Sequence, residues 1–215
     1  MHSIAVVSGS PSEFTLLTTI ERVKQELEII ENDSDALLTA KIKEATSDIE
    51  LRCRTFRRET LTATFWPEAA RGRVRAEGLI LPRWPIASVT SITVDDALVA
   101  GGEYRIDPDA GMIYRLDSSG YPSHWEFCKS SIVVYAGGYK MPGEEGSNLP
   151  PSLEAACIEL VSSFWSARGR DPTVKSEENP GVARFEYWVG AIGAVGDLPP
   201  GVMSKITPFL RSVII

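Results

Sequence analysis

The chain is poor in histidine and cysteine, and it contains no long hydrophobic run. Its 215 residues include two histidines, so a metal centre or a Ser-His-Asp site lacks its usual residue types. The three cysteines are far apart, odd in number and set among apolar neighbours, which favours reduced, buried thiols over a disulfide framework. No apolar run reaches the roughly 18 residues of a membrane span. These absences predict a soluble protein that is not an enzyme, with no metal and no cofactor.

Positive charge is also scarce, because 22 Lys and Arg residues stand against 29 Asp and Glu residues, a formal net charge of -7. Such a balance disfavours a protein that grips phosphate backbones, although DNA can still pass nearby. The arginines that are present cluster at Arg52, Arg54, Arg57 and Arg58, which we interpret as a solvated helix end. The N-terminal residues lack a basic segment followed by an apolar one, so we expect a cytosolic chain with no signal peptide.

The strongest pattern that is present is helical and covers residues 149–169. Apolar residues recur there at steps of three and four, and two prolines stand at the entry, where a missing amide hydrogen has no cost. We expect a core helix whose buried face carries Leu153, Cys157, Leu160, Phe164 and Trp165.

Two further helices are predicted near the N-terminus, over residues 17–30 and 38–57, with a short polar turn between them. Thr18 and Glu21 have the spacing of a capping box at the start of the first helix. Its buried face is expected to carry Leu17, Ile20, Val23, Leu27 and Ile30. Residues 1–14 show no period and predict a flexible arm. A last short helix follows residues 198–201, and the chain closes on an apolar run.

At Glu59 the period changes to two, which indicates a strand. Further strand-like runs, separated by Pro, Gly and Asp turns, cover residues 78–81, 89–94, 103–106, 111–116 and 131–135. The spacing predicts a small antiparallel sandwich or barrel. The fold class is therefore α+β: a small bundle of about four helices with an inserted antiparallel β-module. We expect a helical domain at residues 15–57 with 149–215, and the β-module with its linker at 58–148.

Residues 170–197 form a long segment without a regular period, rich in Pro and Gly. A loop of that length is functional or disordered, and its aromatic residues favour ordering against a neighbour. We therefore expect a contact with another subunit or a partner at Phe185, Tyr187, Trp188 and Val189.

An alternative interpretation makes the β-module a binding domain for a carbohydrate or another ligand, carried on a helical stalk. The candidate stacking residues are Trp84, Tyr104, Tyr114 and Trp125. Core packing is the more common role of such aromatics, so the interpretation depends on their exposure.

The order of these parts resembles the head–tail connector (adaptor) proteins of long-tailed bacteriophages. The likeness covers nearly the whole chain from about Thr18, and none of its motifs is catalytic. Its most specific pieces are the Pro-led helix that reaches Phe164, Trp165 and Arg168, the ending from Leu198 to Arg211, and the strand opener at residues 81–92.

The resemblance implies a virion protein that is assembled in the host cytoplasm and located in the neck between head and tail. Such a protein forms a homo-oligomeric ring, typically of about twelve copies, under the portal protein. The ring extends the DNA channel, passes DNA without sequence-specific binding and docks a stopper or tail-terminator protein, with no membrane involved. The apolar end of this chain suggests a portal contact at Phe209, Leu210, Val213, Ile214 and Ile215.

Overall fold

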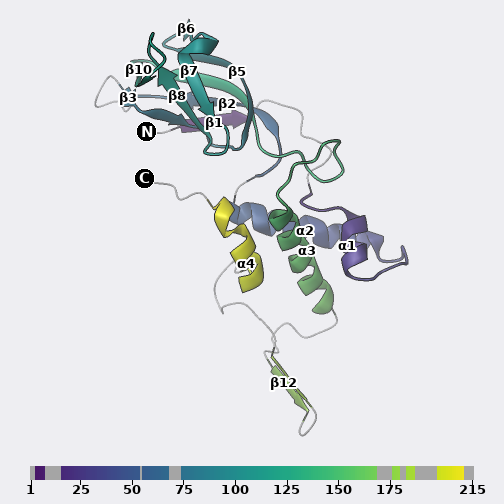
Figure 1. Ribbon diagram of the computed structural model, residues 1–215. Helices are drawn as coiled ribbons and strands as arrows, with labels where there is room; N and C mark the ends of the chain where they lie inside the picture. The colour runs from purple at the N-terminus through teal and green to yellow at the C-terminus, as the bar shows by residue number, and fades with distance from the viewer. Residues whose placement is uncertain are drawn as a thin grey trace. The chain divides into compact units, whose positions relative to one another are not determined.

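The computed structural model describes residues 3–7, 16–53, 55–67, 74–168, 176–179, 183–186 and 198–210. The chain divides into two compact units (Figure 1). The β unit consists of Met1–Thr15 and Thr55–Lys140, and the helical unit consists of Leu16–Arg54 and Met141–Ile215. A mixed α+β fold was expected from the sequence and is confirmed. No described helix is long and apolar enough to cross a membrane.

The helical unit is built around α3 (Pro151–Ser166), which packs against α1 (Ile20–Glu26), α2 (Asp35–Cys53) and α4 (Pro200–Ile206). The single turn η2 (Thr207–Phe209) follows α4. Helix α4 approaches α3 closely through Gly201, where a Cβ atom would lie 2.1 Å from the Glu159 carboxylate. Glu159 also pairs with Lys205, so this contact has both a steric and an ionic component.

Helix α1 is shorter than its sequence pattern predicted. Thr19 is the cap, because its hydroxyl accepts a hydrogen bond from the Arg22 amide at 3.4 Å. The predicted cap, Thr18, is buried and donates its hydroxyl to Glu154 at 3.2 Å. At the other end Glu28 adopts a positive φ of 55°, which ends the helix before Ile30. Ile30 is consequently 94% exposed and not on the buried face.

The β unit contains a sheet with the strand order β1-β2-β11-β5-β6. Its strands are β1 (Ser3–Val7), β2 (Glu59–Phe65), β5 (Ile86–Val94), β6 (Ala97–Leu98) and β11 (Ser131–Gly137), and all pairs are antiparallel. Strand β1 pairs with β2 from Ser3 opposite Phe65 to Val7 opposite Leu61. The prediction of a loose arm is wrong for these five residues, because β2 has a free edge that offers them backbone hydrogen bonds.

A second sheet has the order β4-β8-β7, with β9 paired to β8. These strands are β4 (Gly78–Ile80), β7 (Tyr104–Asp107), β8 (Met112–Leu116) and β9 (Pro122–Ser123), and the turn η1 (Gly101–Glu103) precedes β7. A separate pair joins β3 (Val74–Ala76) to β10 (Trp125–Phe127). Side chains from β2, β5 and β11 share one hydrophobic cluster with side chains from β4, β8 and β10. This shared core gives the β unit the character of a sandwich.

The segment between α3 and α4 contains an antiparallel hairpin, formed by β12 (Ser176–Asn179) and β13 (Ala183–Glu186). The expectation of a wholly irregular segment is therefore wrong here. Phe185, one of the predicted interface residues, lies in β13 opposite Glu177. The other three, Tyr187, Trp188 and Val189, lie outside the described residues.

Candidate interaction surfaces

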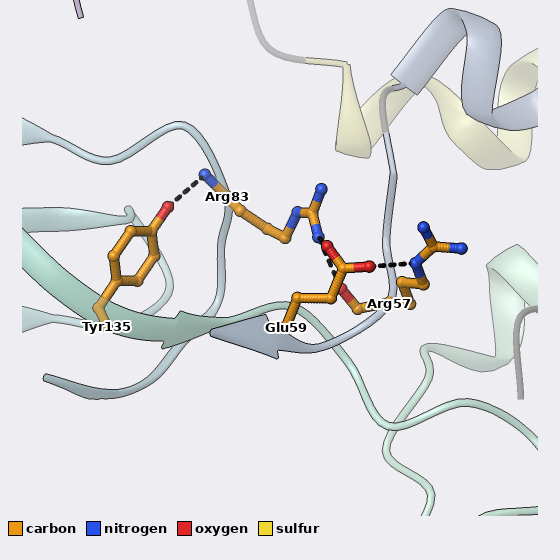
Figure 2. Close-up of polar contacts among 4 residues, drawn as sticks. All are labelled: Arg57, Glu59, Arg83 and Tyr135. Carbon is orange, nitrogen blue, oxygen red and sulfur yellow. Dashed lines mark hydrogen bonds and ion pairs between the residues drawn. The ribbon is translucent and has the colours of Figure 1, made fainter. Parts of the chain in front are cut away.

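Glu59 lies at the centre of an ionic cluster in the β unit, close in sequence to the place where the chain enters this unit. Its carboxylate pairs with Arg57 and, at 2.5 Å, with the Arg83 guanidinium (Figure 2). The same Arg83 guanidinium donates to the Arg57 carbonyl at 3.3 Å, and the Arg83 amide donates to the Tyr135 hydroxyl at 3.1 Å. The cluster therefore links residues 57–59, the start of the loop before β5, and strand β11.

The electrostatics of this cluster favour a charged carboxylate. Burial by itself raises the pKa of Glu59, whose side chain is only 8% exposed. The hydrogen bonds and charges of Arg57 and Arg83 outweigh burial and bring the pKa below its usual value. The interpretation of Arg57 as part of a solvated helix end is therefore wrong, because α2 stops at Cys53.

Residues near the exit from the β unit pair with those near the entry. The Arg58 amide donates to the Tyr139 carbonyl at 2.7 Å, and the Tyr139 amide donates to the Phe56 carbonyl at 2.8 Å. Gly138, with φ of 105°, lies so close that a Cβ atom would be 2.5 Å from the Arg57 carbonyl oxygen. Only glycine tolerates both that conformation and that distance. The ionic cluster around Glu59 and the pairing of residues 56–58 with 138–139 are structural elements that stabilise the β unit.

Helix α3 places the predicted core residues in two different environments. Leu153, Cys157 and Leu160 are buried. Phe164 and Trp165, which were expected in the core, are instead half-buried near the C-terminal end of the helix. Both side chains lie in the last turn of α3, beside Leu37 and Lys41 of α2.

Phe164 and Trp165 line a groove with a volume of about 210 Å³ between α2 and the end of α3. Two cations lie over the rings: the Lys41 ammonium is 5.3 Å from the Phe164 ring centre, and the Arg168 guanidinium is 3.5 Å from the Trp165 ring centre. The whole lining consists of Leu37, Lys41, Phe164, Trp165, Ala167 and Arg168. The groove is thus apolar at its base and cationic at its rim.

The predicted portal-binding residues are only partly described. Phe209 belongs to η2, and Leu210 follows it with 38% of its surface exposed. Val213, Ile214 and Ile215 lie outside the described residues.

The stacking residues of the carbohydrate-binding alternative are largely occupied within the fold. Trp125 is 1% exposed, and its indole N–H donates to the Ile113 carbonyl at 2.9 Å. The Arg115 guanidinium lies 5.6 Å from the same ring. Tyr104 packs against the hydrophobic cluster, while Trp84 and Tyr114 are half-buried. The arrangement provides no open aromatic platform among these residues.

The cysteines divide into two classes. Burial raises the pKa of Cys53 to about 11 and that of Cys157 to about 12, so both thiols stay protonated at neutral pH. Cys128 is exposed, which corrects the expectation that all three are buried. Among the described residues no group of three or more His, Cys, Asp or Glu side chains is arranged to hold a metal ion.

The fold is similar to chains in solved structures of gene transfer agent (GTA) particles. A chain from the neck of the empty particle, computed with C6 symmetry, has a TM-score of 0.56 at 16% identity, over 99% of this chain and 97% of that chain. A chain from the neck of the native particle, computed with C12 symmetry, has a TM-score of 0.52 at 17% identity, over 100% and 98%. A chain from the native virion has a TM-score of 0.55 at 16% identity, over 99% and 97%.

No family model and no curated protein matches the chain. At these identities the likeness establishes a shared fold. The resemblance to head–tail connector proteins, which the sequence suggested, is confirmed at that level, because the similar chains come from the neck of a phage-like particle.

Proposed function

We propose that this chain is a structural neck protein, a head–tail connector (adaptor) of a phage or phage-like particle. The observation that carries the proposal is the fold shared along essentially the whole chain with neck proteins, at a TM-score of 0.56 and 99% coverage. A likeness of both units in their chain order supports a common role better than a likeness of either unit alone. The protein acts by shape and by contacts, without catalysis.

The functional form in this proposal is a ring of identical copies, twelve in number as in the C12 symmetry of one similar neck structure. Repeated head-to-tail contacts between identical subunits close into a ring when the rotation from one neighbour to the next divides a full turn evenly. The hairpin residue Phe185, together with Tyr187, Trp188 and Val189, is proposed to take part in these contacts or in the contact with another partner.

The ring binds under the portal protein and docks a stopper or tail-terminator protein on its other side. We place the portal contact at the chain end, because Leu210 is exposed and an apolar run follows it. The residues assigned to it are Phe209, Leu210, Val213, Ile214 and Ile215. Many weak tails acting together give firm attachment, since the first anchored copies raise the effective concentration of the rest.

The ring extends the channel for DNA without sequence-specific binding. A net charge of -7 supports this role, because an acidic conduit repels phosphates and lets DNA slide. The location in this proposal is the virion neck, reached by assembly in the host cytoplasm.

The direct test is electron microscopy of the protein mixed with purified portal rings of the same particle. The expected result is an added ring with the rotational symmetry of the portal, and mainly monomers in light scattering when the portal is left out. Portal rings without added density at saturating protein contradict the proposal.

The portal contact is tested by removing residues 212–215. The truncated protein is expected to keep its melting temperature, because these residues lie after the last described helix, and to lose portal binding. A Leu98→Asp variant is the control, since Leu98 is an exposed apolar residue of the β unit. Truncated protein that still decorates portals at wild-type occupancy contradicts the assignment.

A further inference from the structure

An apolar knob and an apolar groove occur on different segments of the helical unit, and their charges are complementary. The knob is the exposed Ile30 with its acidic neighbours Glu28 and Glu31, in the connection between α1 and α2. The groove is the site between α2 and the end of α3 described above, with Phe164 and Trp165 at its base. We propose that the knob of one copy binds in the groove of a neighbouring copy and forms the contact that repeats around the ring.

The conformation of the knob is specified by its backbone. The Ile29 amide donates to the Lys24 carbonyl at 2.9 Å, and the Glu28 amide donates to the Gln25 carbonyl at 3.4 Å. This is the hydrogen-bond pattern of a Schellman motif, in which the residue with positive φ is usually glycine. Here that residue is Glu28, with φ of 55°. A side chain kept at a position that disfavours side chains points to a role for its carboxylate.

The knob is also held in place on its far side. The Lys24 ammonium donates to Asn32 at 2.5 Å and to Asp35 at 2.8 Å, so both ends of the connection are tied to α1. A segment that is already ordered loses little conformational entropy on binding. Ile30, with 94% of its surface exposed, is therefore presented on a rigid support and makes little contact with the rest of its own unit.

The groove matches this knob in size and in charge. Its volume of about 210 Å³ is sufficient for one branched aliphatic side chain. Arg168 at the rim lies over Trp165 and has no ion-pair partner among the described residues. Glu28 and Glu31 likewise have none within the described part of the chain. Lys41 contributes less, because Glu44 already pairs with it at 2.7 Å. An aliphatic side chain flanked by carboxylates is thus the complement of this site.

A contact between two different patches is head-to-tail, and a repeated head-to-tail contact generates a ring when the rotation between neighbours closes. The inference rests on the proposed function, because that function supplies the ring, and it adds the residues that join neighbours. A second copy is the occupant that we choose, since the complementary knob is present on every copy.

Disulfide trapping tests the pairing without the portal. In a Cys128→Ser background, one protein carries Ile30→Cys and a second carries Ala167→Cys, a small groove residue. Cys53 and Cys157 are buried and remain inert. Mixing the two at high protein concentration under mild oxidation is expected to give heterodimers, whereas a protein with both substitutions is expected to give a ladder of covalent multimers. The matched control replaces Ile30→Cys by Leu98→Cys, another exposed apolar position.

Two outcomes overturn the inference: heterodimer yields no higher than with Leu98→Cys, or a doubly substituted protein that closes only on itself as a monomer. A charge test checks the same contact. Arg168→Glu is expected to lower the heterodimer yield by up to about fivefold, the range for one exposed ion pair, and Glu31→Arg in the other protein to restore it. Absence of any rescue by Glu31→Arg removes Glu31 as the partner of Arg168.

The results also separate this inference from the proposed function. A ring on the portal without trapped multimers leaves the connector role intact and shows that other residues join the subunits. Trapped multimers without a ring on the portal leave the contact between copies intact and remove the connector role.

Discussion

The two units of this protein place their aromatic residues differently. In the β unit the rings of Phe65, Trp125, Phe127 and Tyr135 are fully buried. In the helical unit the core is aliphatic, and the aromatic residues Phe164 and Trp165 lie half-exposed at its edge. The β unit therefore builds its core around buried rings, although Trp66 and Tyr121 are exposed, whereas Phe164 and Trp165 of the helical unit form aromatic surface that a partner can cover.

The difference has a geometric cause. Two facing sheets are separated by about 10 Å, a distance that large rings from both inner faces fill. Helices approach more closely where small residues lie between them, and Ala45, Ala156 and Cys157 are buried in this unit. The two large rings of α3 lie in its last turn, where they line the groove together with Leu37 and Lys41 of α2.

The largest expected effect is that of Trp125→Ala. We expect a loss of about 3–5 kcal/mol in the free energy of unfolding of the β unit, the usual range for a buried large aromatic. The variant also leaves the Ile113 carbonyl without the indole N–H that it accepts. Urea unfolding followed by circular dichroism measures the loss. A loss below about 1 kcal/mol contradicts the assignment of Trp125 to a closed core.

Gly138→Ala is expected to cost about 3 kcal/mol, because strain from the positive φ adds to overlap with the Phe56 and Arg57 carbonyls. Gly120→Ala is the matched control: its φ is 81°, and no atom lies within 4 Å of the added Cβ. Because Gly120→Ala introduces only the strain of the positive φ, the difference between the two variants measures the cost of the steric overlap at Gly138. Equal melting temperatures of the two variants would show that the overlap with the Phe56 and Arg57 carbonyls adds nothing to the cost of the positive φ.

Glu59→Gln is expected to cost about 2 kcal/mol at neutral pH, because a nearly buried carboxylate with two arginine partners is lost. The pKa of Glu59 is lowered in the folded state, so its contribution is complete above the unfolded value of about 4.3 and is lost as the pH falls through the folded value. The stability difference between wild type and variant should thus shrink in acid. Glu103→Gln, at an exposed ion pair with Arg115, should have little effect at any pH.

The smallest expected effect on stability is that of Trp165→Ala, about 1 kcal/mol, because the ring is half-exposed. The same variant should reduce trapping between Ile30→Cys and Ala167→Cys, since it removes the base of the groove. Trp125→Ala has the opposite profile, with a large loss of stability and little effect on the groove. A melting temperature that falls as far with Trp165→Ala as with Trp125→Ala would remove the contrast between the two units.

The helices that carry the candidate surface were predictable from the sequence, but the exposure of its residues was not. The helical period placed Ile30 on the buried face of α1 and Trp165 on that of α3. Periodicity indicates which residues share a helix face, yet it does not say where the helix stops or how far its partner extends. A glutamate in the left-handed position ends α1, and this signal is weak in sequence because glycine usually occupies that position.

The cluster around Glu59 shows the same limit. Arg57, Glu59 and Arg83 are separated by a strand and a loop, so their approach depends on how β2, β5 and β11 pair. Sequence alone made Arg57 part of a charged helix end. Only the paired sheet brings the two guanidinium groups to one carboxylate and removes most of that carboxylate from solvent.

Local rules thus determined several elements of this protein. The three- and four-residue spacing and the two prolines specified α3, and the alternation after Glu59 specified β2, because each pattern follows from the geometry of a single element. Tertiary structure decided the pairing of β1 with β2, the closed environment of Trp125 and the open groove beside Trp165. These features depend on which surface meets another over long separations in the chain, and no local spacing encodes that choice.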